Sequence, residues 1–435
     1  MRIAIFVGGF PLISETFILR QITGLIDLGH EVDIFAENRP PENAPIQPDV
    51  LKYDLLARTK YIDAPPEATY WEMPVYPLGG ETWLPGAEEP IPNMLRILNA
   101  GEAFIRCYSV APELTKETLD AREYGFQAES LSALYRLYAL CSQSNTYDVV
   151  HAHFGPVGNN FRFAKALWDA PFVVSFHGYD FCTVPRKEGK NVYQRLFETA
   201  DAVTVNSNYT RGRVEALGCA TNKLKKLPEG LNVDDFSFRD RAGKLGEPVR
   251  VVTVGRLTEK KGIEYSIRAV AKVRERYPKL HYDIIGDGPL RSHLEELIDE
   301  LGVGDIVVLH GARDTNYVRE IMRDAQLFML SSVTAESGDV EGQGLVLQEA
   351  QASGLPVLAT DHNGFPESIV PNKSGFLVPE RDSESLADRL MYLIEHPDLW
   401  TKMGLEGRKH VETNYDIRKL NRQLVQIYDE AILNH

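Results

Sequence analysis

The segment Leu330–Pro356 constrains the fold of this chain more than any other part of its sequence. It contains the end of a buried strand, a polar loop rich in glycine, and an amphipathic helix that Gly354 and Pro356 close. Glu341 lies in the loop, and Glu349 lies eight positions later, inside the helix. The free N–H groups and the dipole of a helix amino end attract anions. This strand, loop and helix therefore predict an α/β unit with an anion site between two carboxylates.

The glycines of this loop leave room for a ligand. Gly342 and Gly344 have no Cβ, so that a ligand can approach the backbone as far as Leu345 closely. A diphosphate bound there would have one carboxylate near each end, and hydroxyl-rich groups on both sides would satisfy them. We interpret this as the pattern of a nucleotide-sugar site. For the spacing of Glu341 and Glu349 alone, a solvated helix start with two surface glutamates is the alternative.

A basic turn earlier in the chain fits the same site. The apolar run Val249–Arg256 predicts a buried parallel strand, and the apolar residues of Ile263–Val273 recur at helical spacing. Arg256 and Lys261 therefore fall at the carboxyl end of a strand, where open α/β sheets bind ligands. Fixed cations at this point suit a pyrophosphate leaving group, because they neutralise the charge that develops on it. A solvated basic turn is the alternative.

Taken in order, the motifs of the chain resemble those of the retaining glycosyltransferases of the GT-B fold, of the family-4 type. Within this family they look most like the enzymes that add sugars in bacterial exopolysaccharide assembly, the colanic-acid and amylovoran kind. The resemblance covers nearly the whole chain. It rests on FPLISETFILRQI (Phe10–Ile22), HAHFGP (His151–Pro156), FHGYD (Phe176–Asp180), GRLTEKKG (Gly255–Gly262), SVTAESGDVEG (Ser332–Gly342) and QEA (Gln348–Ala350).

This resemblance implies an α/β architecture of the GT-B type. Two Rossmann-like, doubly wound domains would face a cleft, and a C-terminal helix would cross back to the N-terminal domain. The acceptor-binding domain would span residues 1–229, with an insertion at about 39–145, and the nucleotide-sugar-binding domain would span residues 230–413. Residues 414–435 would form the return helix.

The alternation of apolar runs with helical segments predicts two parallel sheets without reference to any family. Strands are expected in the first unit at Ile3–Val7, Val32–Ala36, Asp148–His153, Phe172–Phe176 and Ala202–Asn206. Those of the second unit are expected at Val249–Val254, His281–Gly286, Ile306–Leu309, Leu327–Leu330, Val357–Ala359 and Phe376–Val378. Inside the insertion, Tyr61–Pro92 is rich in proline and acidic residues and is expected to be loop. The later stretch Pro112–Cys141 is expected to be helical.

The resemblance assigns the donor side of the reaction to the second domain. Arg256 and Lys261 would hold the diphosphate and stabilise the leaving group. Glu349 would accept hydrogen bonds from the ribose hydroxyls. Glu341 and the backbone of Gly342, Gly344 and Leu345 would hold the donor sugar and phosphate. The donor is expected to be a nucleoside-diphosphate hexose, with UDP as the nucleotide.

On the acceptor side, the resemblance points to residues of the first domain. His177 follows the run FVVSF and would contact the transferred sugar or its departing oxygen, although a capping or core histidine is the alternative. Ser14, Glu15 and Thr16 would lie across the cleft near the acceptor, and His153 would stand beside them at a strand tip.

Gly8, Gly9, Gly286 and His151 can each have either a structural or a functional role. Gly8 and Gly9 are expected to follow the first strand, where they would form a tight turn, let the donor phosphate approach, or both. Gly286 is expected in a strand–helix turn that borders the nucleotide, because the third glycine of a dinucleotide fingerprint is missing. His151 alternates with His153 as a metal pair would, but without a third ligand we expect a structural role for it.

The expectation that the transferred sugar retains its anomeric configuration rests on the resemblance. Two-carboxylate retention needs a nucleophile about 5 Å from the general acid, and the sequence offers no evident one. The resembled family is thought to react on one face of the sugar, with the leaving phosphate as base. At position 343 many members carry an aromatic residue where this chain has Gln343, and its loop adds the acidic residues Glu336 and Asp339.

The composition of the chain limits the kinds of binding partner and the cellular compartment that we expect. The 435 residues carry a formal net charge of −15, and a uniformly acidic chain is a poor candidate for nucleic-acid binding. The sequence holds no apolar run long enough to span a membrane, no C-x-x-C pair and no recognisable leader, so we expect a cytoplasmic protein with reduced thiols. At most, a weak peripheral contact with the inner face of the cytoplasmic membrane is expected. Met94–Val110, with apolar residues beside Arg96 and Arg106, is the candidate for it, and a core helix is the alternative.

Three other functions stay open at the level of the sequence. A sucrose-phosphate-synthase-like enzyme would use the same donor site on a small phosphorylated acceptor, and Arg162, Arg186 and Arg195 are candidates to bind that phosphate. A GT-B sugar-nucleotide epimerase would carry motifs of elimination rather than transfer. A catalytically silent sugar-nucleotide-binding protein would not need the complete set of charged donor residues.

The sequence also predicts how activity responds to metal removal. Asp287 and Asp361 do not form the Asp-x-Asp pair with which other sugar-nucleotide folds bind a cation, so Arg256 and Lys261 are expected to replace the metal. Activity should therefore survive excess EDTA, measured as release of the nucleotide product. Stimulation by Mn²⁺ or Mg²⁺ of more than about tenfold would contradict this expectation, because such a gain means that a cation supplies the missing charge.

Overall fold

The computed structural model describes residues 1–41, 44–62, 93–143 and 145–435. Most of the predicted loop Tyr61–Pro92 thus lies outside the described residues. The chain divides into two compact units. Unit 1 comprises Met1–Val205, Arg211–Leu227 and Asn421–His435, and unit 2 comprises Asn206–Thr210 and Pro228–Leu420.

Unit 1 is built on a seven-stranded parallel sheet with the order β3-β2-β1-β4-β5-β6-β7. Its strands are β1 (Arg2–Gly9), β2 (Glu31–Asn38), β3 (Thr59–Tyr61), β4 (Val149–His153), β5 (Phe172–Phe176), β6 (Ala202–Val205) and β7 (Leu224–Lys226). The five expected strands are confirmed. The short edge strand β3 was not expected, because three residues carry no readable periodicity. Gly8 and Gly9 do not follow β1 but end it, and Gly9 pairs with Asn38 of β2.

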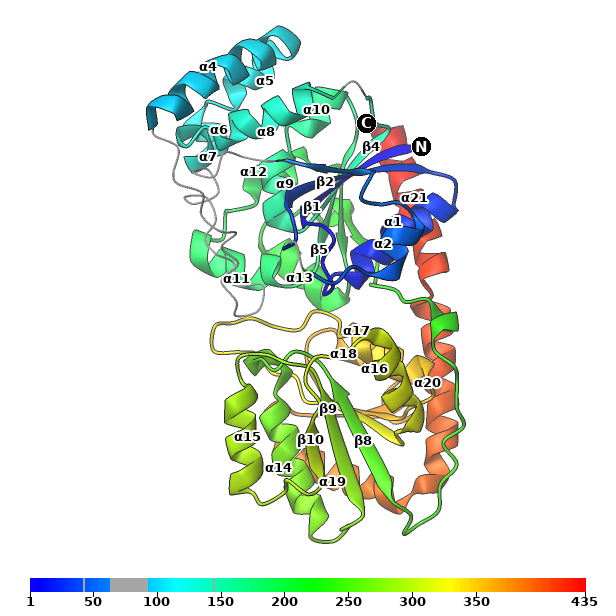
Figure 1. Cartoon of the computed structure of the whole chain (residues 1–435). Helices are drawn as coiled ribbons and strands as arrows, with labels where there is room; N and C mark the ends of the chain where they lie inside the picture. The colour runs from blue at the N-terminus through cyan, green and yellow to red at the C-terminus, as the bar shows by residue number, and fades with distance from the viewer. Residues whose placement is uncertain (42–43, 63–92, 144) are drawn as a thin grey trace. The chain divides into compact units, whose positions relative to one another are not determined.

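Helices cover both faces of this sheet, which explains why inner strands such as β4 and β5 are buried along their whole length. The helices α1 and α21 lie on one face, and α9 and α12 on the other (Figure 1). The helices that follow the chain around the sheet are α1 (Thr16–Asp27), α2 (Pro48–Lys52), α9 (Gly155–Phe161), α10 (Ala164–Trp168), α11 (Tyr179–Glu188), α12 (Gln194–Thr199) and α13 (Asn208–Ala216).

The insertion is helical where the structure describes it. It contains α4 (Asn93–Val110), α5 (Pro112–Glu117), α6 (Ala121–Tyr124), α7 (Phe126–Glu129) and α8 (Ser132–Cys141), which confirms the expectation for Pro112–Cys141. On α4, Ala100, Ala103 and Cys107 are buried, whereas Ile105 is 71% exposed. The side chains of α4 before Ala100 lie outside the described residues. None of the helices in the described part of the chain is long and apolar enough to cross a membrane.

Unit 2 contains a six-stranded parallel sheet with the order β10-β9-β8-β11-β12-β13. Its strands are β8 (Val249–Val254), β9 (Leu280–Ile285), β10 (Val307–Leu309), β11 (Leu327–Leu330), β12 (Val357–Thr360) and β13 (Gly375–Val378). The helices are α14 (Ile263–Arg274), α15 (Arg291–Glu300), α16 (Thr315–Asp324), α17 (Leu345–Ala352), α18 (Phe365–Ser368), α19 (Ser383–Glu395) and α20 (Trp400–Asn414). All six predicted strands and their parallel order are confirmed.

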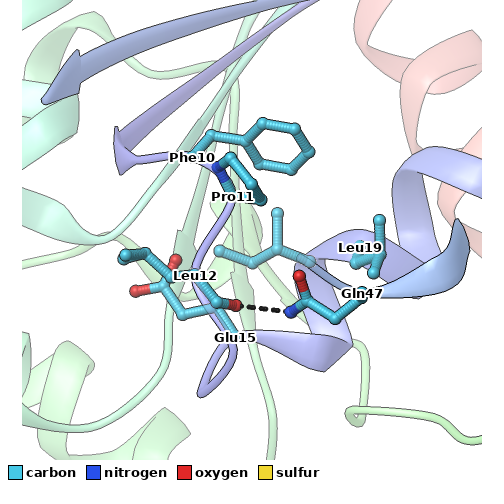
Figure 2. A pocket seen from close by; sticks show the side chains of 7 residues that line it. Phe10, Pro11, Leu12, Glu15, Leu19 and Gln47 are labelled. Carbon is cyan, nitrogen blue, oxygen red and sulfur yellow. Dashed lines mark hydrogen bonds between the residues drawn. The ribbon is translucent and has the colours of Figure 1, made fainter. Parts of the chain in front are cut away.

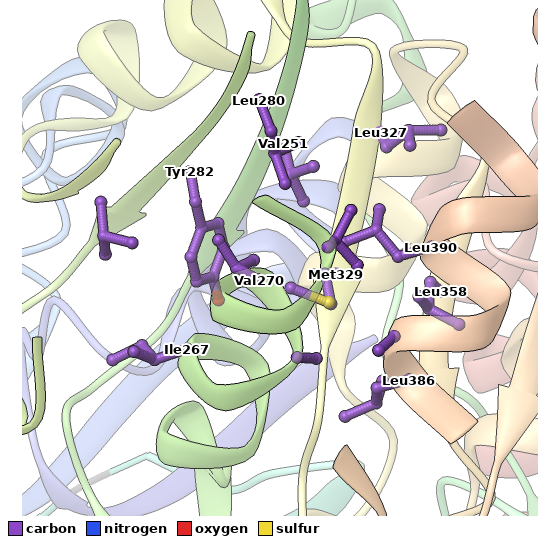
Figure 3. Packing of buried hydrophobic residues seen from close by; sticks show 14 of the residues in the cluster. Val251, Ile267, Val270, Leu280, Tyr282, Leu327, Met329, Leu358, Leu386 and Leu390 are labelled. Atoms are coloured by element: carbon purple, nitrogen blue, oxygen red, sulfur yellow. The ribbon is translucent and has the colours of Figure 1, made fainter. Parts of the chain in front are cut away.

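The core of unit 2 explains why its strands are readable in the sequence. Val251, Tyr282 and Met329 leave neighbouring strands on one face and pack against Ile267 of α14 and Leu390 of α19 (Figure 3). Residues of the opposite parity, such as Val252 and Phe328, pack with Leu347 of α17 on the other face. Full burial of such side chains stabilises by roughly 1.5–3 kcal/mol each. Both parities are therefore apolar, as in a sheet covered on both sides.

The last helix belongs to both units. α21 (Ile417–Asn434) begins in unit 2, and its residues from Asn421 onward are part of unit 1. Asn421 Nδ2 donates to the carbonyl of Arg20 in α1 at 3.2 Å. Tyr428 Oη lies 2.6 Å from His151 Nδ1 of β4. The expected return of the C-terminal helix to the N-terminal domain is thus confirmed.

Gly262 and Gly302 of unit 2 have nearly the same positive φ, but only Gly262 is tightly packed, so that substitutions of the two distinguish a steric clash from backbone strain. Gly262 has φ +58°, and a Cβ on it would lie 2.0 Å from the carbonyl oxygen of Ser331. Gly302 has φ +61°, but a Cβ there would meet nothing within 4 Å. Gly302→Ala should lower the free energy of unfolding by about 1–2 kcal/mol, the left-handed penalty alone. Gly262→Ala should add about 1–3 kcal/mol for the clash.

The midpoints of thermal and urea unfolding measure this difference. Gly302→Ala is the matched control, since it has nearly the same φ in the same unit. Equal losses of stability in the two variants would mean that the contact between the basic turn and the end of β11 is not tight.

Candidate functional site

The predicted donor residues meet at the carboxyl ends of β8 and β11, which are neighbours in the sheet of unit 2. Lys261 ends the 3₁₀ turn Glu259–Lys261 after β8, and Glu341 lies in the loop after β11. Lys261 Nζ and Glu341 Oε2 are 2.8 Å apart, and the two side chains are only 11% and 19% exposed. The structure thus joins in one ion pair two residues that the sequence placed on separate motifs.

This ion pair fixes the charge of the carboxylate. Burial opposes ionisation of Glu341, but the charges of Lys261 and Lys260 and the hydrogen bond from Lys261 outweigh it and lower the pKa of Glu341 to about 2. Glu341 is therefore anionic at neutral pH. Its weak basicity suits a hydrogen-bond acceptor for hydroxyl groups better than a proton acceptor.

A second set of contacts ties the loop to the basic turn. Lys260 Nζ lies 3.0 Å from Asp339 Oδ2, and the N–H of Val333 donates to the carbonyl of Lys260 at 2.8 Å. Arg256 is exposed in the same turn. Two adjacent lysines therefore meet two acidic residues of one loop, with only Arg256 of the predicted cations facing solvent.

The loop runs directly into the amino end of α17. Gly344 is the residue before this helix, at φ +72°, and a Cβ on it would lie 2.5 Å from the ring of Phe365. Leu345 begins the helix, and Glu349 is half-buried within it. The predicted arrangement of a glycine turn, a helix start and a carboxylate on each side is confirmed as local structure. The ligand contacts of these residues remain predictions.

Gln343, the position that departs from the family pattern, anchors the loop. Its Oε1 accepts from the N–H of Glu229 at 2.7 Å, and its Nε2 donates to the carbonyl of Glu229 at 2.8 Å. Glu229 lies in the segment through which the chain enters unit 2. An amide makes both hydrogen bonds at once, which an aromatic side chain at this position does not.

Gly286 has a steric reason to be glycine. Its φ is +145°, and a Cβ would lie 1.9 Å from the carbonyl oxygen of Gly255 in the basic turn. The turn after β9 thus packs directly on the turn after β8, and the N–H of Leu257 donates to the carbonyl of Asp287 at 2.9 Å. This contact accounts for the glycine by itself, and its predicted place beside the nucleotide stays a prediction.

The sequence interpretation missed three residues beside Glu341. His362 and Asn363 follow β12, and Glu380 follows β13. The N–H of Glu341 donates to His362 Nε2 at 3.1 Å, and His362 Nδ1 lies 2.5 Å from Glu380 Oε1. Asn363 Nδ2 donates to the carbonyl of Glu341 at 3.0 Å. The polar run that directly follows the apolar strand Val357–Thr360 was the available signal.

In unit 1, three histidines stand in a row at the carboxyl ends of β4 and β5. His153 Nδ1 and His177 Nε2 are 3.2 Å apart, and His151 contacts Ser175 Oγ at 2.7 Å as well as Tyr428. Burial, with a smaller effect of His177, lowers the pKa of His151 to about 3, and burial lowers the pKa of His153 well below its ordinary value. Both rings are therefore neutral.

Burial also separates the roles of these histidines. His153 is fully buried, and its Nε2 has no hydrogen-bond partner within the described residues. The expected place of His153 beside the acceptor is thus one layer beneath His177, which stacks on it and contacts the rings of Phe17 and Phe154. The structural role expected for His151 agrees with its contacts to Ser175 and α21.

The FHGYD motif is organised by its aspartate. The carboxylate of Asp180 accepts from the N–H groups of His177 at 3.1 Å, Gly178 at 2.8 Å and Gly155 at 3.3 Å. Burial raises the pKa of Asp180, and His177 and these N–H groups oppose the rise. The carboxylate therefore fixes the turn that carries His177 to the motif that follows β4.

The SETF motif contributes a carboxyl group to a small hollow. Glu15 precedes α1 and lines the hollow with Phe10, Pro11, Leu12, Ile18, Leu19 and Gln47 (Figure 2). Burial in these apolar surroundings raises the pKa of Glu15 to about 8. Ser14 is exposed, and Thr16 begins α1. At neutral pH the carboxyl group of Glu15 is thus a hydrogen-bond donor.

Metal binding finds no ready site in the described part of the chain, where no group of three or more His, Cys, Asp and Glu residues stands close enough to hold an ion. The arrangement in unit 2 instead offers cations, a helix amino end and carboxylates. Such a set binds a phosphate together with hydroxyl groups.

Comparison with known proteins gives two family matches that together span the chain. A family described as "Glycosyl transferases group 1" matches residues 234–410, and one described as "Glycosyl transferase 4-like domain" matches residues 14–230. The chain is 31% identical to the colanic acid biosynthesis glycosyltransferase WcaL of Escherichia coli K12, over 98% of this chain and 99% of WcaL. It is also 31% identical to the amylovoran biosynthesis glycosyltransferase AmsK of Erwinia amylovora, over 99% of each chain.

Among solved structures, the chain is similar to HepE of Anabaena, determined in complex with UDP. The TM-score is 0.68, the identity 15%, and the match covers 99% of each chain. At this identity the likeness concerns the fold alone.

The two glutamates of the loop and helix should respond differently to substitution. Glu349→Ala should weaken UDP binding by about tenfold or more, the loss expected for one hydrogen bond to a charged group. Glu341→Ala should leave UDP binding unchanged or strengthen it, because it frees Lys261 from its ion pair, while sugar transfer falls. Calorimetry with UDP measures the first effect, and product formation measures the second.

Glu336→Ala is the matched control, since Glu336 is an exposed glutamate of the same loop. It should change neither quantity. An equal loss of UDP affinity in Glu341→Ala and Glu349→Ala would contradict the division of roles.

Proposed function

The chain belongs to the GT-B glycosyltransferases that combine a group 1 domain with a family-4-like domain, and from this we propose that it transfers a hexose from a nucleoside-diphosphate sugar to a sugar hydroxyl with retention. We place the reaction in the assembly of a bacterial exopolysaccharide. The full-length similarity to WcaL and AmsK, named for colanic acid and amylovoran biosynthesis, supports this assignment.

The ion pair between Lys261 and Glu341 carries the proposal. It lies at the carboxyl ends of two adjacent parallel strands, where α/β sheets bind ligands. A diphosphate at Lys261 and Arg256 would compete with Glu341 for the cation and turn that carboxylate toward the hydroxyls of the attached sugar. A nucleotide sugar satisfies both groups at once.

We take UDP as the nucleotide and propose that no metal is needed. The similar fold of HepE, determined with UDP bound, supports the first choice. Arg256 and Lys261 would supply the positive charge that a divalent cation supplies in other sugar-nucleotide folds.

The charge state of Glu341 supports a reaction on one face of the sugar. A carboxylate with its pKa near 2 and a lysine on it is a weak nucleophile and a weak base. It therefore suits the role of holding the sugar while the leaving phosphate accepts the proton of the incoming hydroxyl.

For the acceptor we propose the groups of unit 1 around His177 and Glu15. The neutral carboxyl group of Glu15 can donate a hydrogen bond, and His177 can exchange one with a sugar hydroxyl. A lipid-linked acceptor would bring the protein to the inner face of the cytoplasmic membrane, where Ile105 and Tyr108 of α4, beside Arg106, would touch the lipid.

A sucrose-phosphate-synthase-like reaction is the weaker alternative. Two of the three arginines that would bind a phosphorylated acceptor are engaged in unit 1. Arg162 is buried and donates to the carbonyls of Asn159 and Glu123, and Arg195 pairs with Glu123 and Glu198. The epimerase and silent-binder alternatives have less support for a different reason, because both family matches are to glycosyltransferases.

A donor screen with a lysine variant tests the proposal. Purified protein is offered UDP-glucose, UDP-galactose and GDP-mannose over a panel of sugar acceptors, and nucleotide release is measured. Lys261→Ala should lower turnover by on the order of 10²–10³, as is typical for losing one preorganised charge stabiliser. Lys260→Ala, which removes the neighbouring ion pair with Asp339, should lower it by at most about fivefold, equivalent to ~1 kcal/mol.

Unchanged turnover in a folded Lys261→Ala variant would remove Lys261 from the leaving-group site. Retention is tested separately, from the anomeric configuration of the product.

A further inference from the structure

The residues that follow β12 and β13 form a polar cluster against the peptide of Glu341. The cluster consists of His362, Asn363 and Glu380, and His362 is fully buried. Glu380 is itself held, because its Oε2 accepts from the N–H of Thr334 at 2.8 Å. Two atoms of the cluster, His362 Nε2 and Asn363 Nδ2, contact the peptide of Glu341, and Glu380 holds His362 in place.

The contacts determine which nitrogen of His362 carries the proton. His362 Nε2 faces two donors, the N–H of Glu341 at 3.1 Å and Asn363 Nδ2 at 2.8 Å. It must therefore be the bare nitrogen. His362 Nδ1 then carries the proton and donates to Glu380 Oε1 at 2.5 Å. The carboxylate of Glu380 selects the tautomer that can accept from Glu341.

Glu341 is thus held at three points. Its N–H donates to His362, its carbonyl accepts from Asn363 Nδ2 at 3.0 Å, and its carboxylate pairs with Lys261 at 2.8 Å. The first two contacts fix the backbone of Glu341, so that its side chain extends toward a ligand from a fixed Cα position. A loop residue without them would have to be ordered when the ligand binds.

We propose that His362 and Glu380 are positioning residues of the donor site, which hold the Glu341 peptide so that its carboxylate meets the hydroxyls of the transferred sugar. This inference rests on the proposed function and adds to it. Neither residue touches the substrate in this account. Both act through Glu341, and their substitution should affect the sugar but not the nucleotide.

The sheet itself creates the cluster. Thr360, the last residue of β12, pairs with Val378, the last residue of β13. His362 and Glu380 each lie two residues beyond this pair, so that parallel register brings them to the same height. β11 on the other side of β12 leads into the loop of Glu341.

The same contacts predict that sugar binding depends on pH. Burial lowers the pKa of His362, and the carboxylates of Glu380 and Glu341 offset this only in part, with Lys261 acting in the same sense as burial. Within the described residues, the charged groups that face His362 are those of Glu380, Glu341 and Lys261. Asn363 and the ring of Phe365 complete its surroundings. Protonation of Nε2 removes the acceptor for Glu341. Sugar binding should therefore weaken as pH falls through a value below about 6.5, the ordinary value for histidine.

Two substitutions of His362 separate positioning from packing. His362→Phe keeps a ring but has no acceptor for the N–H of Glu341. His362→Gln keeps an oxygen near the position of Nε2 and cannot be protonated near neutral pH. His410→Phe is the matched control, since His410 is a half-buried histidine of unit 2 that contacts the backbone of Glu367 instead.

Calorimetry measures the affinity of each variant for UDP and for UDP-glucose, or for the sugar nucleotide that the donor screen selects in its place. The ratio of the two affinities isolates the sugar. His362→Phe should reduce this ratio by about tenfold, the effect of one misplaced hydrogen bond to a charged group, and leave UDP affinity unchanged. His362→Gln should restore most of the ratio and abolish its fall at acid pH. His410→Phe should match the wild type.

A double-mutant cycle tests whether His362 acts through Glu341. In a Glu341→Ala background, His362→Phe should have no further effect on the ratio, because no carboxylate remains to be positioned. Should His362→Phe fail to fold, Glu380→Gln serves instead. It keeps the shape of the side chain but removes the charge that selects the tautomer, and it should lower the ratio in the same direction.

The possible outcomes are distinct. A folded His362→Phe variant that prefers the sugar nucleotide over UDP as strongly as the wild type overturns the positioning role and leaves the transferase intact. Additive effects of His362→Phe and Glu341→Ala also overturn it. A wild-type protein that binds no sugar nucleotide and releases no nucleotide in the donor screen overturns the proposed donor function, and the positioning role with it.

Discussion

The ion pair between Lys261 and Glu341 joins the two charged motifs at the carboxyl edge of the sheet in unit 2. It exists because β8 and β11 are neighbours, so that the turn after one strand meets the loop after the other. A buried ion pair is weak evidence for stability, since desolvation of the two charges offsets most of their attraction. Apolar residues would fill this place equally well. The presence of the charged side chains of Lys261 and Glu341 at the carboxyl edge of a parallel sheet is therefore better explained by the binding of a charged ligand than by a contribution to folding.

Unit 1 uses the opposite electrostatic arrangement. Three of its polar residues near the same edge of the sheet are His151, His153 and Glu15, and burial keeps these three neutral at neutral pH. A neutral set of donors and acceptors suits hydroxyl groups, just as the charged set of unit 2 suits a diphosphate. The helix that completes unit 1 comes from the end of the chain, and its Tyr428 is a hydrogen-bond partner of His151 beside Ser175. Unit 1 therefore requires residues that are synthesised after most of unit 2.

The sequence predicted those features that depend on local pattern. The eleven expected strands needed only an apolar run between turn residues, although several of their ends differ by one residue from the expected ones, as at Val205, where the strand expected at 202–206 ends. The site residues Lys261 and Glu341 were assigned to one ligand through the resemblance, but their direct contact depends on strand order. His362 and Glu380 could not be found in this way. Their contact follows from the register of β12 and β13, in which Thr360 pairs with Val378, and no periodicity in the chain specifies a register between buried parallel strands.

The loop between β11 and α17, the proposed donor site, is held in place by contacts within unit 2. Its glycine stretch is anchored on both sides, by His362 and Asn363 at Glu341 and by the backbone of Glu229 at Gln343. Gly344 lies against the ring of Phe365, which leaves no space for a side chain. Charge stabilisation is most effective when the groups are fixed before the reaction, because no free energy is then spent on reorienting them. The two anchors use backbone groups and buried side chains, so that Lys261, Glu341 and the amino end of α17 remain available to the ligand. Substitutions at the anchors should consequently change what the loop does to a sugar long before they change whether unit 2 folds.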